Sequence, residues 1–208
     1  MAEFTFYTVA MSRGQISRWA LHEAGADYEQ VVFDWASRPD TFKDINAMNK
    51  VPTLVHHHGG HDHVVTEAAA INHYLAETHP QAGLLPDTHE KAAYFRWLFF
   101  AAGPLEQAVV AKAMGWEVPE GKSGMAGFGS FDLTLDAIDG WLSQNDFAAG
   151  NRFTMADTYL GSQFVWGLRF GSIPERPSFR AYVDRITQRP AYAEANAIDA
   201  KLIAEAAQ

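Results

Sequence analysis

The spacing of apolar residues changes character near position 85, and this change limits the folds open to the chain. Over residues 1–80, short runs typical of strands alternate with segments of helical spacing. After residues 81–87, which contain a glycine and a proline, all of the longer apolar patterns have helical spacing. We therefore expect an α/β domain over 1–80, a linker over 81–87 and an all-α helical domain over 88–208.

Within the first eighty residues, the expected order of elements is β-α-β-α-β-β-α. The pair Gly59-Gly60 is the turn of a predicted hairpin, because two glycines readily adopt the positive φ angles of tight hairpin turns. The expected strands cover 4–7, 28–33, 53–55 and 64–65, and the expected helices cover 15–23, 41–47 and 67–77.

The second part of the chain predicts only helices. A long helix over 88–114 should bend at Gly103-Pro104, because proline removes a helical hydrogen bond. A helix over 131–142 has its apolar residues on one face. Thr154 and Asp157 have the spacing of a capping box at the start of another helix. Prolines open the last two expected helices, 177–189 and 190–207.

Composition and charge exclude several classes of function. The chain of 208 residues is 48% hydrophobic, which is enough for a sizeable core. It has no cysteine, which excludes disulfides, thiolate metal sites and cysteine nucleophiles. With 16 basic and 25 acidic residues it lacks the basic footprint of a nucleic-acid-binding protein. No apolar run approaches membrane-spanning length and no targeting segment is visible, so we expect a cytoplasmic protein without a membrane partner.

Five histidines surround the Gly59-Gly60 turn. Imidazoles this close together can bind zinc, copper or nickel. A polar, exposed hairpin tip is the simpler interpretation, and we expect no functional metal. The histidines are His56, His57, His58, His61 and His63, with Asp62 between them.

Several short motifs, taken in order, resemble the cytosolic glutathione transferase family. The segment 49–55 reads NKVPTLV, similar to the family's G-K-V-P-x-L with Asn49 in place of glycine, and TEAAAI at 66–71 is similar to T-E-S-x-A-I. The other matching segments are Tyr74-Leu75, Leu84-Leu85-Pro86, FTMAD at 153–157 and Arg189-Pro190-Ala191. The S-R-G loop at 12–14 is more similar to bacterial members of the family.

This resemblance implies a thioredoxin-like N-terminal domain, an all-α helical C-terminal domain and a homodimer. It also implies glutathione as co-substrate, without a metal. The implied activity is a glutathione S-transferase reaction, in which the glutathione thiolate attacks a small hydrophobic electrophile.

The resemblance also implies residues for glutathione binding. A Val-Pro bond held cis presents the main chain of Val51, next to Pro52, to a ligand that pairs with it like an added strand. Glu67 can pair with the γ-glutamyl ammonium, and the helix that starts at Ala68 attracts the γ-glutamyl carboxylate. The usual serine hydroxyl is missing at Ala68. Candidates for the glycine end of glutathione are Lys50, Lys43 and Trp35, of which Lys50 is the best placed.

Two residues compete for the catalytic role. Lowering a thiol pKa of ~8.5 by two units needs ~2.7 kcal/mol of preferential thiolate stabilisation. Ser12 lies five residues after Tyr7, as in the serine-type classes, and Arg13 adds positive charge beside it. Tyr7 also fits, because a tyrosine ends the first strand in the tyrosine-type classes. The loop sequence favours Ser12, and Tyr7 stays open.

The second substrate should lie in an apolar pocket, because it is a hydrophobic electrophile. Candidates for the pocket wall are Met11, Leu105, Val109, Met114, Trp116 and Trp166.

Two alternatives to a transferase stay open. Ala68 and Asn49 favour a catalytically silent binding protein, and the same thiolate could serve isomerisation, peroxide reduction, dehalogenation or ether cleavage. The S-S-C-x-W stretch typical of maleylacetoacetate isomerases is absent.

Overall fold

The computed structural model describes residues 2–34, 36 and 38–206. Contacts between Cα atoms divide the chain into two compact units. The first, the N-terminal unit, consists of residues 1–85 together with 188–208. The second, the helical unit, consists of residues 86–187.

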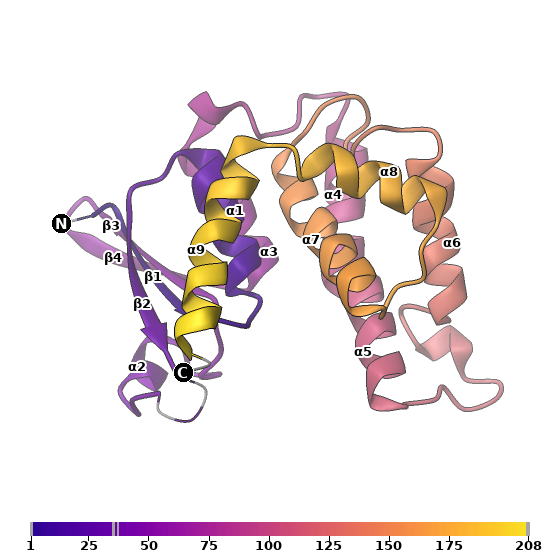
Figure 1. Ribbon diagram of the computed structural model, residues 1–208, viewed down its shortest axis with the longest axis horizontal. Helices are drawn as coiled ribbons and strands as arrows, with labels where there is room; N and C mark the ends of the chain where they lie inside the picture. Colours follow the sequence, from indigo (N-terminus) through magenta and orange to yellow (C-terminus); the bar gives the residue numbers. More distant parts are fainter. Residues whose placement is uncertain (1, 35, 37, 207–208) are drawn as a thin grey trace. The chain divides into compact units, whose positions relative to one another are not determined.

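A four-stranded mixed sheet forms the centre of the N-terminal unit, with the order β2-β1-β3-β4 (Figure 1). Strand β1 is parallel to β2 and antiparallel to β3, and β3 and β4 form the expected hairpin. The sequence predicted this order of strands and helices, and the structure confirms it. The elements are β1 (Phe4–Val9), α1 (Gly14–Ala24), β2 (Tyr28–Phe33), α2 (Phe42–Ile45), β3 (Thr53–His58), β4 (His61–Thr66) and α3 (Ala68–Thr78).

The two faces of β1 meet different helices, because successive strand residues point to opposite sides. Phe4 and Phe6 are fully buried on one face, where the Arg18 guanidinium of α1 lies 5.3 Å from the Phe6 ring. On the other face the Tyr7 ring packs 5.2 Å from the ring of Phe42, which belongs to α2. Helices therefore cover both faces of the sheet.

The last helix, α9 (Pro190–Ala206), packs against α1 in the N-terminal unit (Figure 1). The buried Arg18 Nε donates to Asp199 Oδ1 at 2.7 Å, and Arg189 forms a bidentate pair with Glu23 at 2.6 Å. Sequence spacing grouped this helix with the helical domain. Its contacts group it with the sheet, because side chains far apart in the sequence fasten it to α1.

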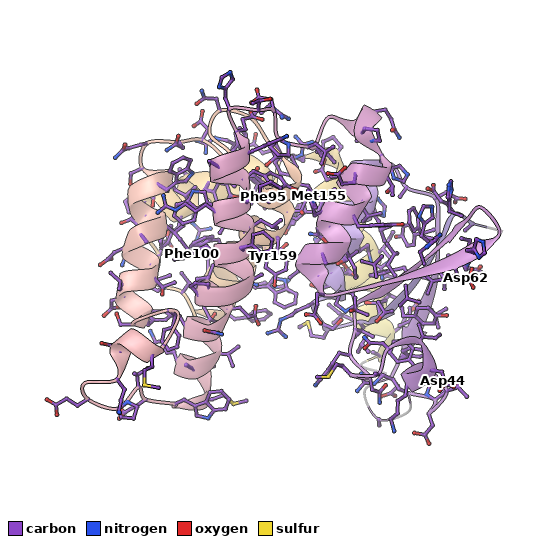
Figure 2. All side chains as sticks on the ribbon, turned by 180° about the vertical axis from the view of Figure 1, so that it is seen from behind. Asp44, Asp62, Phe95, Phe100, Met155 and Tyr159 are labelled. Carbon is purple, nitrogen blue, oxygen red and sulfur yellow. The ribbon has the colours of Figure 1, made fainter. Side chains whose placement is uncertain are left out.

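The helical unit contains α4 (Lys91–Phe100), α5 (Glu106–Met114), α6 (Phe131–Leu142), α7 (Met155–Phe170) and α8 (Pro177–Ile186). A π-helical turn over Ala101–Leu105 joins α4 to α5 and contains Pro104. The expected bend is therefore a π-turn, which accommodates the hydrogen bond that proline cannot make. Figure 2 labels Phe95 and Phe100 on α4, and Met155 and Tyr159 on α7, the helix that packs against it.

Among the described residues, no helix has the length and hydrophobicity needed to cross a membrane. Two short 3-10 turns, Pro80–Ala82 and Ser123–Met125, complete the described helical elements.

A buried carboxylate organises the start of α7. Asp157 is fully buried, and four donors surround its two oxygens. The backbone N–H groups of Ala148 and Thr154 donate at 2.7 and 2.8 Å. The Tyr182 hydroxyl donates at 2.8 Å and the Thr154 hydroxyl at 3.1 Å. The predicted capping-box carboxylate therefore also joins α7 to α8 and to the loop that precedes α7.

We expect this carboxyl to make the stability of the helical unit depend on pH. Burial raises the pKa of Asp157 from 3.8 to about 6, although its hydrogen bonds lower it. Between these two pKa values the folded chain holds a proton that the unfolded chain has released. The free energy of unfolding should therefore fall by up to about 3 kcal/mol as the pH rises from 4 to 6.

Urea unfolding at several pH values checks this expectation. In Asp157→Asn this part of the pH dependence should disappear, since an amide does not titrate. The control is Asp132→Asn, an exposed carboxyl in the first turn of α6, which should keep the wild-type slope. Equal slopes in Asp157→Asn and wild type would contradict the assignment.

Candidate functional site

The sheet register brings three chain segments to one edge. Tyr7 near the end of β1 lies opposite Thr53, the first residue of β3. On its other side Thr53 lies opposite Thr66, the last residue of β4. The loop after β1, the segment before β3 and the start of α3 therefore leave the sheet at the same place. We call this edge, with residues 10–13, 50–52 and 67–68, the Thr53 edge.

The loop after β1 holds Ser12 in a buried position, with 7% of its surface exposed. Its hydroxyl donates to the Val9 carbonyl at 2.8 Å and accepts from the Gly14 N–H at 3.0 Å. A Cβ at position 14 would lie 1.9 Å from Thr8 Oγ1, so glycine is required here. Arg13 precedes the first turn of α1 and is exposed. The hydroxyl and the positive end of α1 are thus brought together.

The Val51–Pro52 peptide bond is cis, as the resemblance implies. The segment before it is clamped by the buried Asn46, whose amide donates to the Lys50 carbonyl and to Thr53 Oγ1, both at 2.9 Å. The sequence pattern did not predict this role for Asn46. A polar residue six positions before the proline was the available signal, but nothing local shows that it turns inward.

Asn49 has a φ of 51° in the left-handed region. Asparagine is one of the few residues that tolerate this region, so it can replace the family's glycine without losing the local backbone path. The presence of Asn49 in place of glycine therefore supports a catalytically silent protein less strongly than the sequence alone indicated.

Glu67 has the most unusual backbone conformation at this edge, with φ 67° and ψ 118°. A non-glycine residue held at such angles costs of order 1–3 kcal/mol, and such positions cluster at functional sites. Glu67 is exposed and stands at the N-cap of α3 without a side-chain capping bond. Ala68, the first helical residue, is buried with 7% exposed. An exposed carboxylate thus stands next to the N–H groups at the start of α3.

The three candidates for the glycine end of glutathione differ in their surroundings. Lys50 is exposed at the Thr53 edge, directly before Val51. Lys43 lies on α2 and forms an exposed ion pair with Asp40 at 3.1 Å. Trp35 lies outside the described residues.

Tyr7 lies in an aromatic cluster. Its ring packs 5.8 Å from Phe33 and 5.2 Å from Phe42. Burial, and to a lesser degree the charge of Asp62, raise the pKa of the Tyr7 hydroxyl above its usual value. Tyr7 is half-buried, and its ring packs on the α2 side of the sheet.

The candidates for the apolar pocket fall in different places. Met11 belongs to the N-terminal unit, is 46% exposed and lines a cavity of about 530 Å³ with the ends of β2 and α9. Trp116 is 65% exposed and lines a cavity of about 630 Å³ in the helical unit. Leu105 is fully buried, Val109 and Trp166 are half-buried, and Met114 is exposed.

The histidine hairpin follows the register of β3 and β4. His56 lies opposite His63 and His58 opposite His61, so these four share one face. His57 is on the other face and contacts Asp62 at 2.6 Å; Figure 2 labels Asp62 on this hairpin. Among the described residues, no three His, Cys, Asp or Glu side chains are grouped so that they could hold a metal ion.

His56 is buried, and its Nδ1 lies 2.8 Å from the Tyr74 hydroxyl. Burial lowers the pKa of His56, although Glu3 opposes this effect. This histidine is therefore part of the packing between β3 and α3.

Comparison with known proteins identifies the family of the chain. The family model described as glutathione S-transferase, N-terminal domain, matches residues 2–77, and the model for the C-terminal domain matches residues 122–190. The chain belongs to the glutathione S-transferase family. The fold is that of the family, with a thioredoxin-like N-terminal domain and a helical C-terminal domain.

Three relatives illustrate the range of the family. Glutathione S-transferase 3 of Zea mays is 27% identical, with 92% of each chain covered. A probable maleylacetoacetate isomerase of Caenorhabditis elegans is 30% identical, with 86% of each chain covered. The structure of a sphingomonad glutathione S-transferase complexed with glutathione is 27% identical, with a TM-score of 0.75, over 94% of this chain and 98% of that one.

Proposed function

We propose that this protein is a glutathione transferase that binds glutathione at the Thr53 edge and activates its thiol for attack on a small hydrophobic electrophile. The observation that carries the proposal is the meeting of the Ser12 loop, the cis Val51–Pro52 segment and the strained Glu67 at one edge of the sheet. The glutathione complex of the sphingomonad relative supports the choice of ligand.

In this proposal the main chain of Val51 pairs with the glutathione backbone as an added strand would. Glu67 pairs with the γ-glutamyl ammonium, and the N–H groups at the start of α3, beginning with Ala68, receive the γ-glutamyl carboxylate. Lys50 receives the carboxylate at the glycine end. The strain at Glu67 is consistent with this role, because the unusual backbone angles hold its carboxylate at the helix N-terminus.

Ser12 is the proposed donor to the thiolate. Its hydroxyl turns its hydrogen from the Val9 carbonyl to the sulfur, while the Gly14 N–H keeps donating to the hydroxyl oxygen and strengthens the new bond. A serine hydroxyl is not a base at neutral pH, so the thiol proton leaves to water or to a glutathione carboxylate. Arg13 and the α1 dipole add to the stabilisation of the anion. The aromatic packing of Tyr7 supports a structural role for that residue.

The roles of Ser12 and Tyr7 can be separated by titrating the ultraviolet thiolate band of bound glutathione. Ser12→Ala should raise the thiol pKa and slow conjugation of an aryl halide by ~10²–10³-fold, the range for losing one donor to a developing anion. Tyr7→Phe should leave the thiol pKa near its wild-type value. If Tyr7→Phe raises the pKa and Ser12→Ala does not, the enzyme is of the tyrosine type. If neither moves it, the proposal of side-chain activation is wrong.

The binding role of Glu67 can be measured by calorimetry. Glu67→Ala should weaken glutathione binding by ~1.5–3 kcal/mol, since a charge-assisted bond is lost. Glu77→Ala removes an exposed carboxylate near the other end of α3 and should leave the affinity unchanged. Ala68→Ser should tighten binding by restoring the hydroxyl of the family. Unchanged affinity in Glu67→Ala would refute this assignment.

We also propose that the chain forms a homodimer, on the resemblance to its family. Light scattering at micromolar concentration should give twice the chain mass of 23.0 kDa. A mass near that of one chain would contradict it.

Isomerisation is a second candidate function. It is favoured by the 30% identity to the probable maleylacetoacetate isomerase, over 86% of each chain. The same thiolate would serve, so the Thr53 edge does not separate the two reactions. Assays with an aryl halide and with maleylacetoacetate, in the presence of glutathione, would distinguish them.

A further inference from the structure

The cavity beside Ser12 lies wholly within the N-terminal unit. It is bounded by the end of β1 and its loop, by the end of β2 and by the last turns of α9, and its volume is about 530 Å³. Small-molecule sites typically span ~300–1,000 Å³. Val9, Ala10 and Met11 line this cavity, and the Val9 carbonyl accepts the hydrogen bond of the Ser12 hydroxyl, so the cavity lies beside the Ser12 loop.

The described wall of this cavity is apolar except for two carboxylates. Met11, Val32, Phe33, Leu202 and Ile203 form much of the apolar part. The carboxylates are Asp34 and Glu205, and among the described lining residues there is no Lys, Arg or His.

Both carboxylates are exposed. Asp34 is held in place because its Oδ1 accepts from the Ala36 N–H at 2.9 Å. Glu205 has a lysine neighbour, Lys201, at 3.8 Å, an exposed pair that solvent screens. The described lining therefore carries two carboxylates, one of them beside the ammonium group of Lys201.

We propose that Asp34 and Glu205 make the electrophile site of the proposed reaction, at this cavity, select uncharged substrates over those that carry a carboxylate. The proposal rests on the proposed function and adds a substrate class to it. The apolar wall takes up a hydrophobic molecule, while Asp34 and Glu205 repel an anionic substituent. The same selection would disfavour maleylacetoacetate, which is an anion, and so favours the transferase over the isomerase.

The test compares two electrophiles that differ in one charge, 4-chloro-3-nitrobenzoate and its methyl ester, with saturating glutathione. Chloride leaves from both, and the sulfur–carbon bond forms at the same carbon. After correction for the uncatalysed rates, wild type should prefer the ester in kcat/KM by at least about tenfold. The double variant Asp34→Asn/Glu205→Gln should reduce this preference about fivefold to tenfold at low salt, and less so at high salt, which screens exposed charges.

The matched control is Asp27→Asn/Glu29→Gln. It removes two exposed carboxylates at the opposite end of β2, outside this cavity. Its preference for the ester should equal that of wild type. An unchanged preference in Asp34→Asn/Glu205→Gln, or an equal reduction in the control, would overturn the proposal.

A second pair of variants tests the location. Val32→Trp should fill the cavity and raise the KM for the ester at least about fivefold, without changing the calorimetric affinity for glutathione. Val64→Trp alters another exposed valine of the same sheet, outside the cavity, and should change neither value. An unchanged KM in Val32→Trp would show that the electrophile binds elsewhere.

Failure of the proposed function is distinguishable from failure of this inference. If neither substrate is turned over, the transferase proposal is wrong. Calorimetry with the unreactive pair 3-nitrobenzoate and its methyl ester then decides the cavity's charge preference. Tighter binding of the ester, lost in Asp34→Asn/Glu205→Gln, supports the inference, and equal binding of both compounds overturns it.

Discussion

The pairing of β3 with β1 on one side and with β4 on the other is the constraint on which the candidate site depends. Because Thr53 starts β3 opposite both Tyr7 and Thr66, three turns leave the sheet at one edge. A register shift of one residue would turn the side chains of β3 to the opposite face. Thr53, Leu54, Val55 and His56 are all buried, so both faces of β3 are packed and such a shift would place each side chain among the wrong neighbours.

At the Thr53 edge, unfavourable backbone angles and tight packing hold the candidate site residues in place. Glu67 and Asn49 both occupy positive φ, and Gly14 is packed too closely for any side chain. The buried Asn46 holds the turn before Pro52 with three hydrogen bonds. Such costs are typical of sites whose geometry matters more than local stability.

A buried ion pair attaches α9 to α1 in the N-terminal unit. The Arg18–Asp199 pair joins residues 181 positions apart, and both side chains are buried. Burial raises the pKa of Asp199, and the neighbouring Arg18 opposes this shift. A buried pair is weak evidence for stability but strong evidence for a specific arrangement, because breaking it leaves a charge without a partner. The arrangement brings Leu202 and Glu205 to the wall of the cavity beside the Ser12 loop.

The sequence by itself determined the order of strands and helices, the hairpin turn at Gly59-Gly60 and the capping carboxylate Asp157. These depend on neighbours within a few residues, so periodicity and turn chemistry reveal them. Family motifs added the cis bond at Pro52. Only the tertiary structure decided that α9 packs against α1, that Asn46 turns inward and that Tyr7 joins an aromatic cluster. These outcomes depend on contacts between side chains distant in the sequence, whose energies appear only when the packed chain brings them together.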